Sequence, residues 1–274
     1  MDRGPGLIAE FGRAGTDPPS DVGALELVVQ GTVQGVGFRP FVHRLATTEG
    51  LSGWVRNAAD GVHIGIFGEA AGIARFRYRL TSETPLLARI DTIREGPLSG
   101  DPPDGFTILA SAAGDARTAV TADAAMCVDC RSELFDPADR RFGYPFLNCT
   151  HCGPRFSIVR GLPYDRAGTS MRHFAMCPAC QSEYDDPGDR RFHAQPTACP
   201  DCGPSVWIEE AGNPNRKFTG MSAIEDAQSR LRSGGIVAVK GLGGFHLACN
   251  ALDPRAVDRL RKRKNRPGKP FAVM

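Results

Sequence analysis

The sequence predicts an α+β protein built from three successive parts. Strand and helix patterns alternate over residues 25–110, eight of the nine cysteines are paired between residues 127 and 202, and further helix and strand patterns run from residue 220 to the end. The chain has 274 residues, which is long enough for about one to three domains with their own cores. We place the three parts at residues 25–110, 120–210 and 220–274.

Composition and charge exclude several classes of protein. The chain is 41% hydrophobic and 23% charged, as in ordinary soluble globular proteins, and its formal net charge of +2 argues against a polyanion-binding protein outside local basic clusters. No apolar run reaches the about 20 residues of a membrane helix, and residues 1–24 lack the apolar centre of a signal peptide. We therefore expect a flexible leader and a cytoplasmic protein, whose thiols favour metal over disulfides.

The first part opens with a strand, a helix and a hairpin. ALELVVQG at residues 24–31 is an apolar strand pattern, and Pro40 suits the first turn of a helix that Gly50 would stop. Residues 51–57 and 62–68 have strand patterns, and the Asp-Gly turn between them is typical of a hairpin.

A second helix pattern covers residues 69–82, where apolar residues recur at helical spacing. Weaker strand patterns follow at residues 88–95 and 105–109. The order βαββαβ predicts a ferredoxin-like sandwich for the first part.

The segment GTVQGVGFR, residues 31–39, joins the first strand to the first helix. Such a loop lets successive backbone N–H groups point inward at a helix N-terminus, which makes an anion cradle without any side chain. Arg39 lies at the junction and can add a bidentate clamp. The glycine spacing matches neither the P-loop nor the dinucleotide motif, and a tight turn of purely structural use is the alternative.

The eight paired cysteines form a repeat. The spacing C-x2-C-x18-C-x2-C occurs twice at an offset of 50 residues, and the flanking motifs DP, DRRF and CGP recur with it. The candidate ligands are Cys127, Cys130, Cys149, Cys152, Cys177, Cys180, Cys199 and Cys202. Two C-x-x-C turns complete a tetrahedral shell around one ion, so we predict two Zn2+ sites.

Four sulfurs close each predicted shell and leave no position for water or substrate, so we expect both zinc ions to be structural. Disulfides or chance cysteines are one alternative, and a redox C-x-x-C pair is another, although the βαβ setting of such a pair is missing. The spacing leaves open which pairs share each ion. His151, His173 and His193 lie nearby, and we expect loop or surface histidines rather than ligands.

The third part begins after the cysteines. We expect NPNRKFTG at residues 213–220 to be a linker and residues 221–235 to form an amphipathic helix. A short apolar strand, a second glycine loop and an apolar turn follow. Asp253 then suits the cap of a last helix and Pro254 its first turn.

A basic run marks this last helix. Residues 255–269 hold eight Lys or Arg against one Asp, which fits a solvated helix face or a nucleic-acid-binding patch. Few aromatic residues lie near the run, which counts against base stacking. We expect KPFAVM, residues 269–274, to enter a further strand with an unpaired edge, so the chain is expected to be a fragment of a longer protein.

Residues 25–110 closely resemble the acylphosphatase family, whose signatures G-x-V-Q-G-V-G-F-R and G-W-V-x-N are both present. The resemblance implies hydrolysis of a carboxyl-phosphate mixed anhydride, in which Arg39 binds the phosphoryl group and Asn57 orients the attacking water. It also implies that the phosphoryl group is bound by the backbone N–H groups of Gln34, Gly35, Val36, Gly37 and Phe38. That division suits phosphoryl transfer, which needs positioning and charge stabilisation more than a general base.

The third part resembles the start of the YrdC-like family. The turn at residues 247–251 is similar to that family's Leu-Ala-Cys-Asp-Ala turn, with Asn250 in place of the acid, and it is followed by a K-x-R-P motif that binds nucleotide phosphates. The resemblance implies nucleotide binding by Lys240, His246, Lys264 and Arg266. Lys240 stands where the broader family has a different residue, which suggests a different acyl substrate.

The order of the three parts resembles the HypF family, the carbamoyltransferases of [NiFe]-hydrogenase maturation. The resemblance implies that carbamoyl phosphate is hydrolysed in the first part and that the carbamate is adenylated with ATP and Mg2+ in the YrdC-like part. A further domain would transfer the carbamoyl group to a C-terminal cysteine of a partner protein. The zinc region is expected to be a rigid spacer between the two active sites.

Other functions remain alternatives at this stage. They are a stand-alone acylphosphatase with a structural zinc region, a zinc-ribbon nucleic-acid-binding protein, and a non-catalytic scaffold. We expect neither a membrane nor nucleic acid as a partner. The sequence leaves open the acyl-group selectivity, the oligomeric state and whether these residues alone carry out adenylation.

Overall fold

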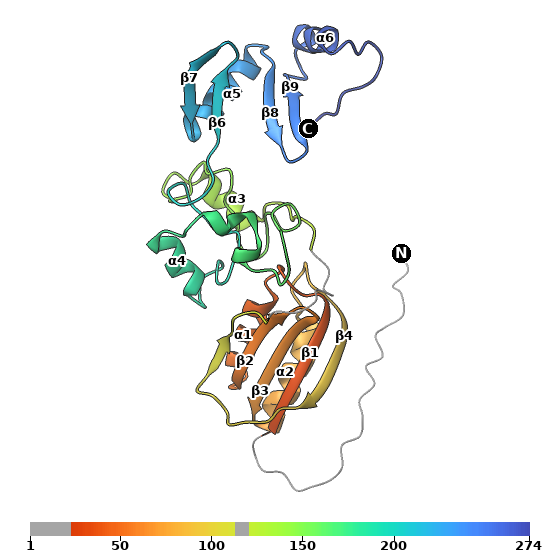
Figure 1. The fold of residues 1–274 in the computed structure, drawn as a ribbon, viewed down its shortest axis with the longest axis vertical. Coiled ribbons are helices and arrows are strands. Elements are labelled where there is room, and N and C mark those ends of the chain that lie inside the picture. Colours follow the sequence, from red (N-terminus) through yellow and green to blue (C-terminus); the bar gives the residue numbers. More distant parts are fainter. Residues whose placement is uncertain (1–22, 113–120) are drawn as a thin grey trace.

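The computed structural model describes residues 23–112 and 121–274, so nearly all of the expected leader, residues 1–24, lies outside the described residues. Three parts follow one another along the long axis (Figure 1). A sheet with two helices forms one end, a loop-rich part with short helices lies in the middle, and hairpins with two helices form the other end (Figure 1).

The first part is the predicted ferredoxin-like βαββαβ fold. Its helices are α1 (Phe38–Thr48) and α2 (Ala70–Ser82), and its strands are β1 (Gly23–Thr32), β2 (Ser52–Ala58), β3 (Gly61–Gly68), β4 (Arg89–Pro97) and β5 (Phe106–Ile108). The strand order is β4-β1-β3-β2-β5, in which the first four strands are antiparallel neighbours and β5 pairs parallel to β2. The short edge strand β5 lies within the weak strand pattern predicted at residues 105–109 and extends the sheet beyond the six elements of the βαββαβ unit.

The core of this part lies between the sheet and its helices. Leu27 and Val29 of β1 and Ile64 of β3 alternate inward, as expected for strands with one covered face. Phe76 and Leu80 of α2 are no more than 1% exposed and pack against them. Each such side chain stabilises the fold by about 1.5–3 kcal/mol, so the loop between β1 and α1 rests on a rigid base.

The middle part has little regular structure. It holds α3 (Val128–Phe135), η1 (Arg166–Gly168), η2 (Ser170–His173) and α4 (Pro178–Asp185). A small apolar cluster includes Tyr144, Leu147 and Met171, and buried cysteines make up much of the rest. This part therefore depends on its sulfur clusters and polar side chains more than on an apolar core.

The third part begins with a hairpin that the sequence analysis missed. It contains β6 (Trp207–Glu210), β7 (Asn213–Thr219), α5 (Met221–Arg232), β8 (Val237–Gly241), β9 (Gly244–Ala248) and α6 (Pro254–Arg263). The expected linker at residues 213–220 is wrong, because most of it forms β7 against β6. Lys217 lies 5.2 Å from the Trp207 ring and 3.3 Å from the Glu209 carboxylate, so polar pairs stabilise this hairpin in place of apolar alternation.

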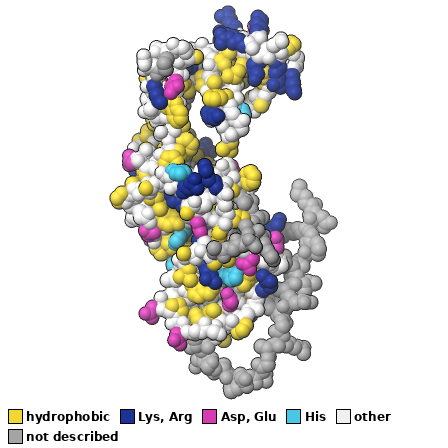
Figure 2. All heavy atoms as spheres, in the orientation of Figure 1, with side chains coloured by type: hydrophobic (Ala, Val, Ile, Leu, Met, Phe, Trp, Pro, Cys, Tyr) yellow, Lys and Arg dark blue, Asp and Glu magenta, His cyan; other side chains and the backbone are white. Residues whose placement is uncertain are grey.

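The last helix begins as predicted, since the Asp253 side chain accepts a hydrogen bond from the Arg255 amide at 2.9 Å. The strand expected at residues 269–274 is wrong, because these residues form neither helix nor strand. Arg261 instead donates to the carbonyls of Arg266, Pro267 and Lys269, which folds the tail against α6. Lys and Arg side chains gather over this end (Figure 2). Within the described ranges, no helix is long and apolar enough to cross a bilayer.

Candidate functional site

The loop between β1 and α1 leaves its amides free. Gly35 and Gly37 have φ angles of 72° and 74°, which side chains rarely adopt. In the part of the chain that the structure describes, the backbone amides of residues 34–38 donate no hydrogen bond, while the carbonyls of Gln34 and Gly35 accept from Thr121 and Arg155. The loop therefore offers five unpaired donors at the N-terminus of α1.

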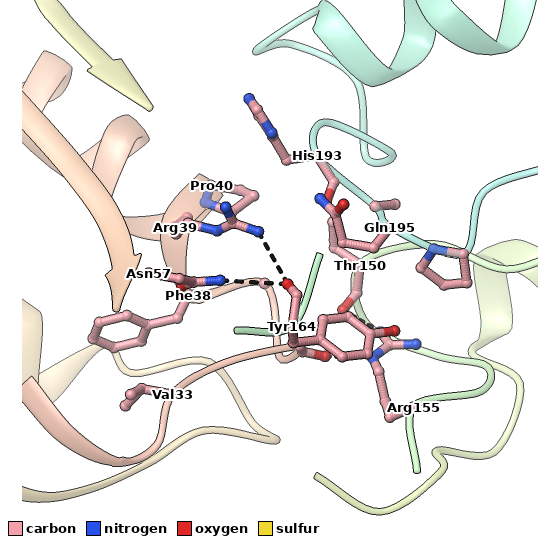
Figure 3. A pocket seen from close by; sticks show the side chains of 14 residues that line it. Val33, Phe38, Arg39, Pro40, Asn57, Thr150, Arg155, Tyr164, His193 and Gln195 are labelled. Carbon is pink, nitrogen blue, oxygen red and sulfur yellow. Dashed lines mark hydrogen bonds between the residues drawn. The ribbon is translucent and has the colours of Figure 1, made fainter. Parts of the chain in front are cut away.

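Arg39 and Asn57 lie together beside this loop. The Arg39 side chain is 9% exposed, and its Nη2 donates to Asp165 Oδ1 at 2.8 Å and, more weakly, to the Tyr164 carbonyl at 3.5 Å. In one orientation of its amide, Asn57 donates to the Tyr164 carbonyl at 3.4 Å (Figure 3). In the other, its oxygen accepts from Nε and Nη2 of Arg39 at 3.2 Å, which we favour because it removes a contact between donors.

Gln34 contributes more than a backbone amide. Its side chain is buried and donates to the carbonyls of Ala58 and Gly61 at 2.7 and 3.0 Å. Its Oε1 accepts from the Tyr164 amide at 3.0 Å. The side chain thus ties the loop both to the β2–β3 turn and to the middle part of the chain, a role that the sequence analysis missed.

A cavity of about 20 Å³ lies at this junction and has room for about one water molecule. The loop and Arg39 form one wall, and Tyr164, His193 and Gln195 of the middle part form the other (Figure 3). The middle part was expected to be a spacer, and the structure instead brings it into direct contact with the predicted phosphoryl site. The sequence analysis predicted none of these three residues for the site.

His193 was expected to be a loop or surface histidine, and the structure places it in the cavity wall. Its φ is 53°, an uncommon value for a residue with a side chain. The ring packs against those of Tyr184 and Phe192, at 4.9 and 4.7 Å between centroids. Burial, together with the nearby charge of Arg39, lowers the pKa of His193 to about 4, so the ring is neutral near pH 7.

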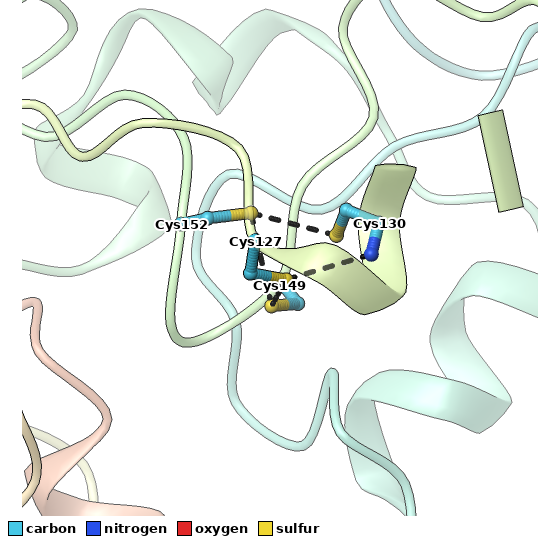
Figure 4. Close-up of side chains that lie close together, drawn as sticks. All are labelled: Cys127, Cys130, Cys149 and Cys152. Carbon is cyan, nitrogen blue, oxygen red and sulfur yellow. Dashed lines mark hydrogen bonds between the residues drawn. The ribbon is translucent and has the colours of Figure 1, made fainter. Parts of the chain in front are cut away.

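The cysteines form two groups, one from each repeat. Cys127, Cys130, Cys149 and Cys152 lie together (Figure 4), and Cys177, Cys180, Cys199 and Cys202 form the second group. Neighbouring sulfurs are 3.4–3.9 Å apart in the first group and 3.6–3.7 Å apart in the second. Zn–S bonds of about 2.3 Å in a tetrahedron place sulfurs about 3.8 Å apart, so both groups fit zinc. In the described residues neither group includes a histidine.

Each sulfur group is bonded by an arginine of the other repeat. Arg190 donates to Cys130 Sγ at 3.1 Å, and Arg140 donates to Cys180 Sγ at 3.0 Å. Arg140 also pairs with Glu183 of the second repeat at 2.9 Å. These bonds place positive charge beside the thiolates and cross from one repeat to the other.

The neighbouring arginines repeat the pattern in buried form. Arg141 is 1% exposed in its side chain and donates to the Ala198 carbonyl at 2.9 Å, and Arg191, 4% exposed, donates to the Asn148 carbonyl at 3.1 Å. Arg191 also pairs with Glu133, as Arg141 pairs with Glu183. The repeated DRRF motif therefore supplies two reciprocal bridges, and its duplication was the sequence signal for them.

The predicted nucleotide-binding residues lie in the third part and are not gathered. Lys240 lies over the Phe245 ring at 4.9 Å, and His246 lies on the opposite strand of the same hairpin. Lys264 follows α6, and Arg266 donates to the Pro270 carbonyl at 3.1 Å. Over the described residues, no hydrogen bond or ion pair joins any two of the four.

Family models match all three parts of the chain. The acylphosphatase model matches residues 25–108, the HypF finger model matches residues 126–159 and 176–209, and a model described as telomere recombination matches residues 229–274. An acylphosphatase of Mannheimia succiniciproducens is 47% identical over 76 residues, which cover 27% of this chain and 83% of that protein.

Longer relatives match almost the whole chain. Carbamoyltransferase HypF2 of Cupriavidus necator is 56% identical over 254 residues, which cover 91% of this chain and 31% of that protein. Carbamoyltransferase HypF of Rhodobacter capsulatus is 55% identical over 252 residues, which cover 92% of this chain and 33% of that protein. A crystal structure of full-length HypF in the phosphate- and nucleotide-bound form superimposes with a TM-score of 0.82 at 45% identity and covers 94% of this chain and 33% of its own. The chain thus spans about a third of the length of these relatives.

Proposed function

Because the chain belongs to the HypF family of carbamoyltransferases, and its residues 25–108 to the acylphosphatase family, we propose that the glycine loop hydrolyses carbamoyl phosphate. The observation that supports this is the set of five unpaired amides at residues 34–38, beside the guanidinium of Arg39. A phosphoryl group is the anion that such a set of donors fits best.

The reaction needs few protein groups. The amides of Gln34, Gly35, Val36, Gly37 and Phe38 and the guanidinium of Arg39 would donate hydrogen bonds to the phosphoryl oxygens, and the N-terminus of α1 adds a favourable dipole. Asn57 would orient a water molecule for attack on phosphorus. The new P–O bond forms as the bond to the carbamate oxygen breaks, and the phosphate product releases one proton to solvent. Carbamate leaves as a carboxylate-like anion, so no general acid is required.

Two structural zinc ions would hold the middle part. Four thiolates would close each shell and leave no open position for a reaction at the zinc ion. The effect of the zinc would therefore be purely structural. Free thiolates and closed zinc shells persist in a reducing compartment, so we place the protein in the cytoplasm.

The later steps are proposed for the family-length protein. Carbamate would be adenylated with ATP and Mg2+ at the YrdC-like part, where Lys240, His246, Lys264 and Arg266 are candidates for binding the nucleotide. The carbamoyl group would then pass to a C-terminal cysteine of a hydrogenase-maturation partner protein. Carbamate decomposes in water, so its release beside the consuming site avoids loss.

Phosphate release from acetyl phosphate and carbamoyl phosphate by the zinc-loaded chain tests this function. Arg39→Ala and Asn57→Ala should each lower turnover of both substrates by about 100-fold or more, as expected for removal of one transition-state donor. Arg44→Ala is the matched control, because Arg44 lies exposed on the same helix. Zinc content should remain at two per chain in every variant. Retained turnover in both Arg39→Ala and Asn57→Ala would reject the site.

A further inference from the structure

The phosphoryl site contains many donors and few acceptors. The five loop amides and Arg39 all donate, and the Asn57 side chain contributes a single amide oxygen as acceptor in either orientation. This suits a phosphoryl group, whose oxygens accept. A carbamoyl group differs from an acetyl group in one respect that matters here, since its NH2 carries two donors where acetyl has a methyl. A site that prefers carbamoyl needs acceptors beside the acyl carbon.

Two acceptors beside Arg39 come from the middle part of the chain. The Tyr164 carbonyl lies 3.5 Å and Asp165 Oδ1 lies 2.8 Å from Nη2 of Arg39. Within the described ranges, the second oxygen of Asp165, Oδ2, accepts no hydrogen bond. The Asp165 side chain is 31% exposed, so this oxygen is a free acceptor beside Arg39, which itself lines the cavity.

Two other polar side chains of the cavity wall, Gln195 and Thr150, already make hydrogen bonds within the protein. Gln195 accepts from the Arg166 amide and donates to Tyr184 and to the His193 carbonyl, each at 2.8 Å. Thr150 donates to the Arg190 carbonyl at 3.1 Å. Replacing any of these bonds by one to substrate would leave a buried group unpaired, which costs about 1–3 kcal/mol.

The 164–165 segment is also held in a fixed position relative to the loop. The Tyr164 amide donates to Gln34 Oε1 at 3.0 Å, and its ring packs so closely that a Cβ on Gly35 would lie 3.2 Å away. Tyr164 itself is 3% exposed. The acceptors of this segment are thus fixed relative to the donors of the loop, as a specificity contact requires.

We propose, on the basis of the function above, that Asp165 together with the Tyr164 carbonyl binds the amide of the acyl group while Arg39 bridges Asp165 and the phosphoryl group. The region with the sulfur clusters then determines acyl selectivity. A methyl group at the same place would leave Oδ2 of Asp165 without a hydrogen-bond donor, so acetyl phosphate binds less well in the transition state. Arg39 screens the carboxylate from the phosphoryl charge.

The test compares kcat/KM for carbamoyl phosphate and acetyl phosphate in the zinc-loaded chain, after subtraction of spontaneous decomposition. Asp165→Ala should lower the ratio of carbamoyl to acetyl by about 10- to 100-fold, the effect of a hydrogen bond to a charged group. Asp165→Asn keeps the size and one neutral acceptor and should lower the ratio by about 3- to 10-fold. Asp129→Asn removes an exposed carboxylate of the same region and should leave the ratio unchanged.

A ratio that stays within twofold in both Asp165 variants overturns the proposal. Equal acceleration of the two substrates would show that Asp165 only competes for Arg39. Zinc content and thermal unfolding identify a variant that fails to fold, in which case Asp165→Asn decides. The two failures can be told apart. If the proposed function is wrong, Arg39→Ala retains turnover of both substrates, whereas if only this inference is wrong, Arg39→Ala still loses turnover of both.

Discussion

Replacing Arg190 should weaken zinc binding in the repeat to which Arg190 does not belong. Arg190 Nη1 lies 3.1 Å from Cys130 Sγ and 3.9 Å from Cys127 Sγ, although Arg190 follows Cys180 of the second group in the chain. Arg190→Met keeps a long apolar stem and removes the charge. The first sulfur group should therefore lose metal first, and Arg140→Met should have the mirrored effect on the second group.

The size of the effect follows from geometry and exposure. A hydrogen bond to a charged partner contributes about 1.5–3 kcal/mol, and the 23% exposure of the Arg190 side chain reduces this toward about 1–2 kcal/mol. Because about 1.4 kcal/mol is tenfold, zinc affinity should fall about 5- to 30-fold. Replacing residues that contact metal ligands typically lowers metal affinity by about 10- to 100-fold, which overlaps this range.

The assay combines a colour-forming chelator with alkylation of released thiols, and mass spectrometry identifies which cysteines react. In Arg190→Met, the thiols of the first group, Cys127, Cys130, Cys149 and Cys152, should be alkylated at lower chelator concentration than those of the second. Arg131→Met is the control, because Arg131 lies exposed next to Cys130 without a side-chain bond to a sulfur. Release from the second group in Arg190→Met, or no release from either, would refute the crossed arrangement.

Two further predictions concern the loop and its wall. Gly35→Ala should destabilise the fold by about 1–3 kcal/mol and abolish phosphate release, because a Cβ at φ 72° would be strained and would lie 3.2 Å from the Tyr164 ring. Gly50→Ala is the control, since Gly50 has a similar φ of 68° but open space around it. That variant should lose about 1 kcal/mol of stability in thermal unfolding and keep its activity. The pKa of His193, about 4 through burial and Arg39, lies below its usual 6.5, so stability should fall as pH drops from about 6.5 toward 4. His193→Asn tolerates the same φ and should show a smaller fall in denaturant midpoint over that range; equal slopes in both proteins would contradict the assignment.

The fold of the first part was predictable because its elements carry strong local patterns. The helix predicted at residues 69–82 forms as α2, Ala70–Ser82, since apolar residues at helical spacing must face the sheet. The strand β7 was missed because Arg216 and Lys217 pair with two carboxylates of β6, and polar pairing leaves no apolar alternation to detect. Local periodicity therefore predicts covered elements better than solvated hairpins.

The candidate site was predictable on one side only. Glycine positions and Arg39 are visible within one short segment, whereas Tyr164 and Asp165 contact Arg39 across 125 and 126 residues of sequence. Their place in the site depends on how the middle part packs, which no local pattern encodes. Their assignment as acceptors, like the catalytic assignment of Arg39 and Asn57, is open to the substrate measurements above.

The exchange of Arg140 and Arg190 between the repeats has a consequence for how such a region can be divided. In a two-fold symmetric dimer, a contact from residue i of the first copy to residue j of the second is always matched by one from residue i of the second copy to residue j of the first. The two repeats show that relation within one polypeptide: each half contains its own sulfurs but relies on the other half for the guanidinium beside them. A peptide cut to a single repeat would lack its counter-charge and would regain it only by pairing with a second molecule of itself.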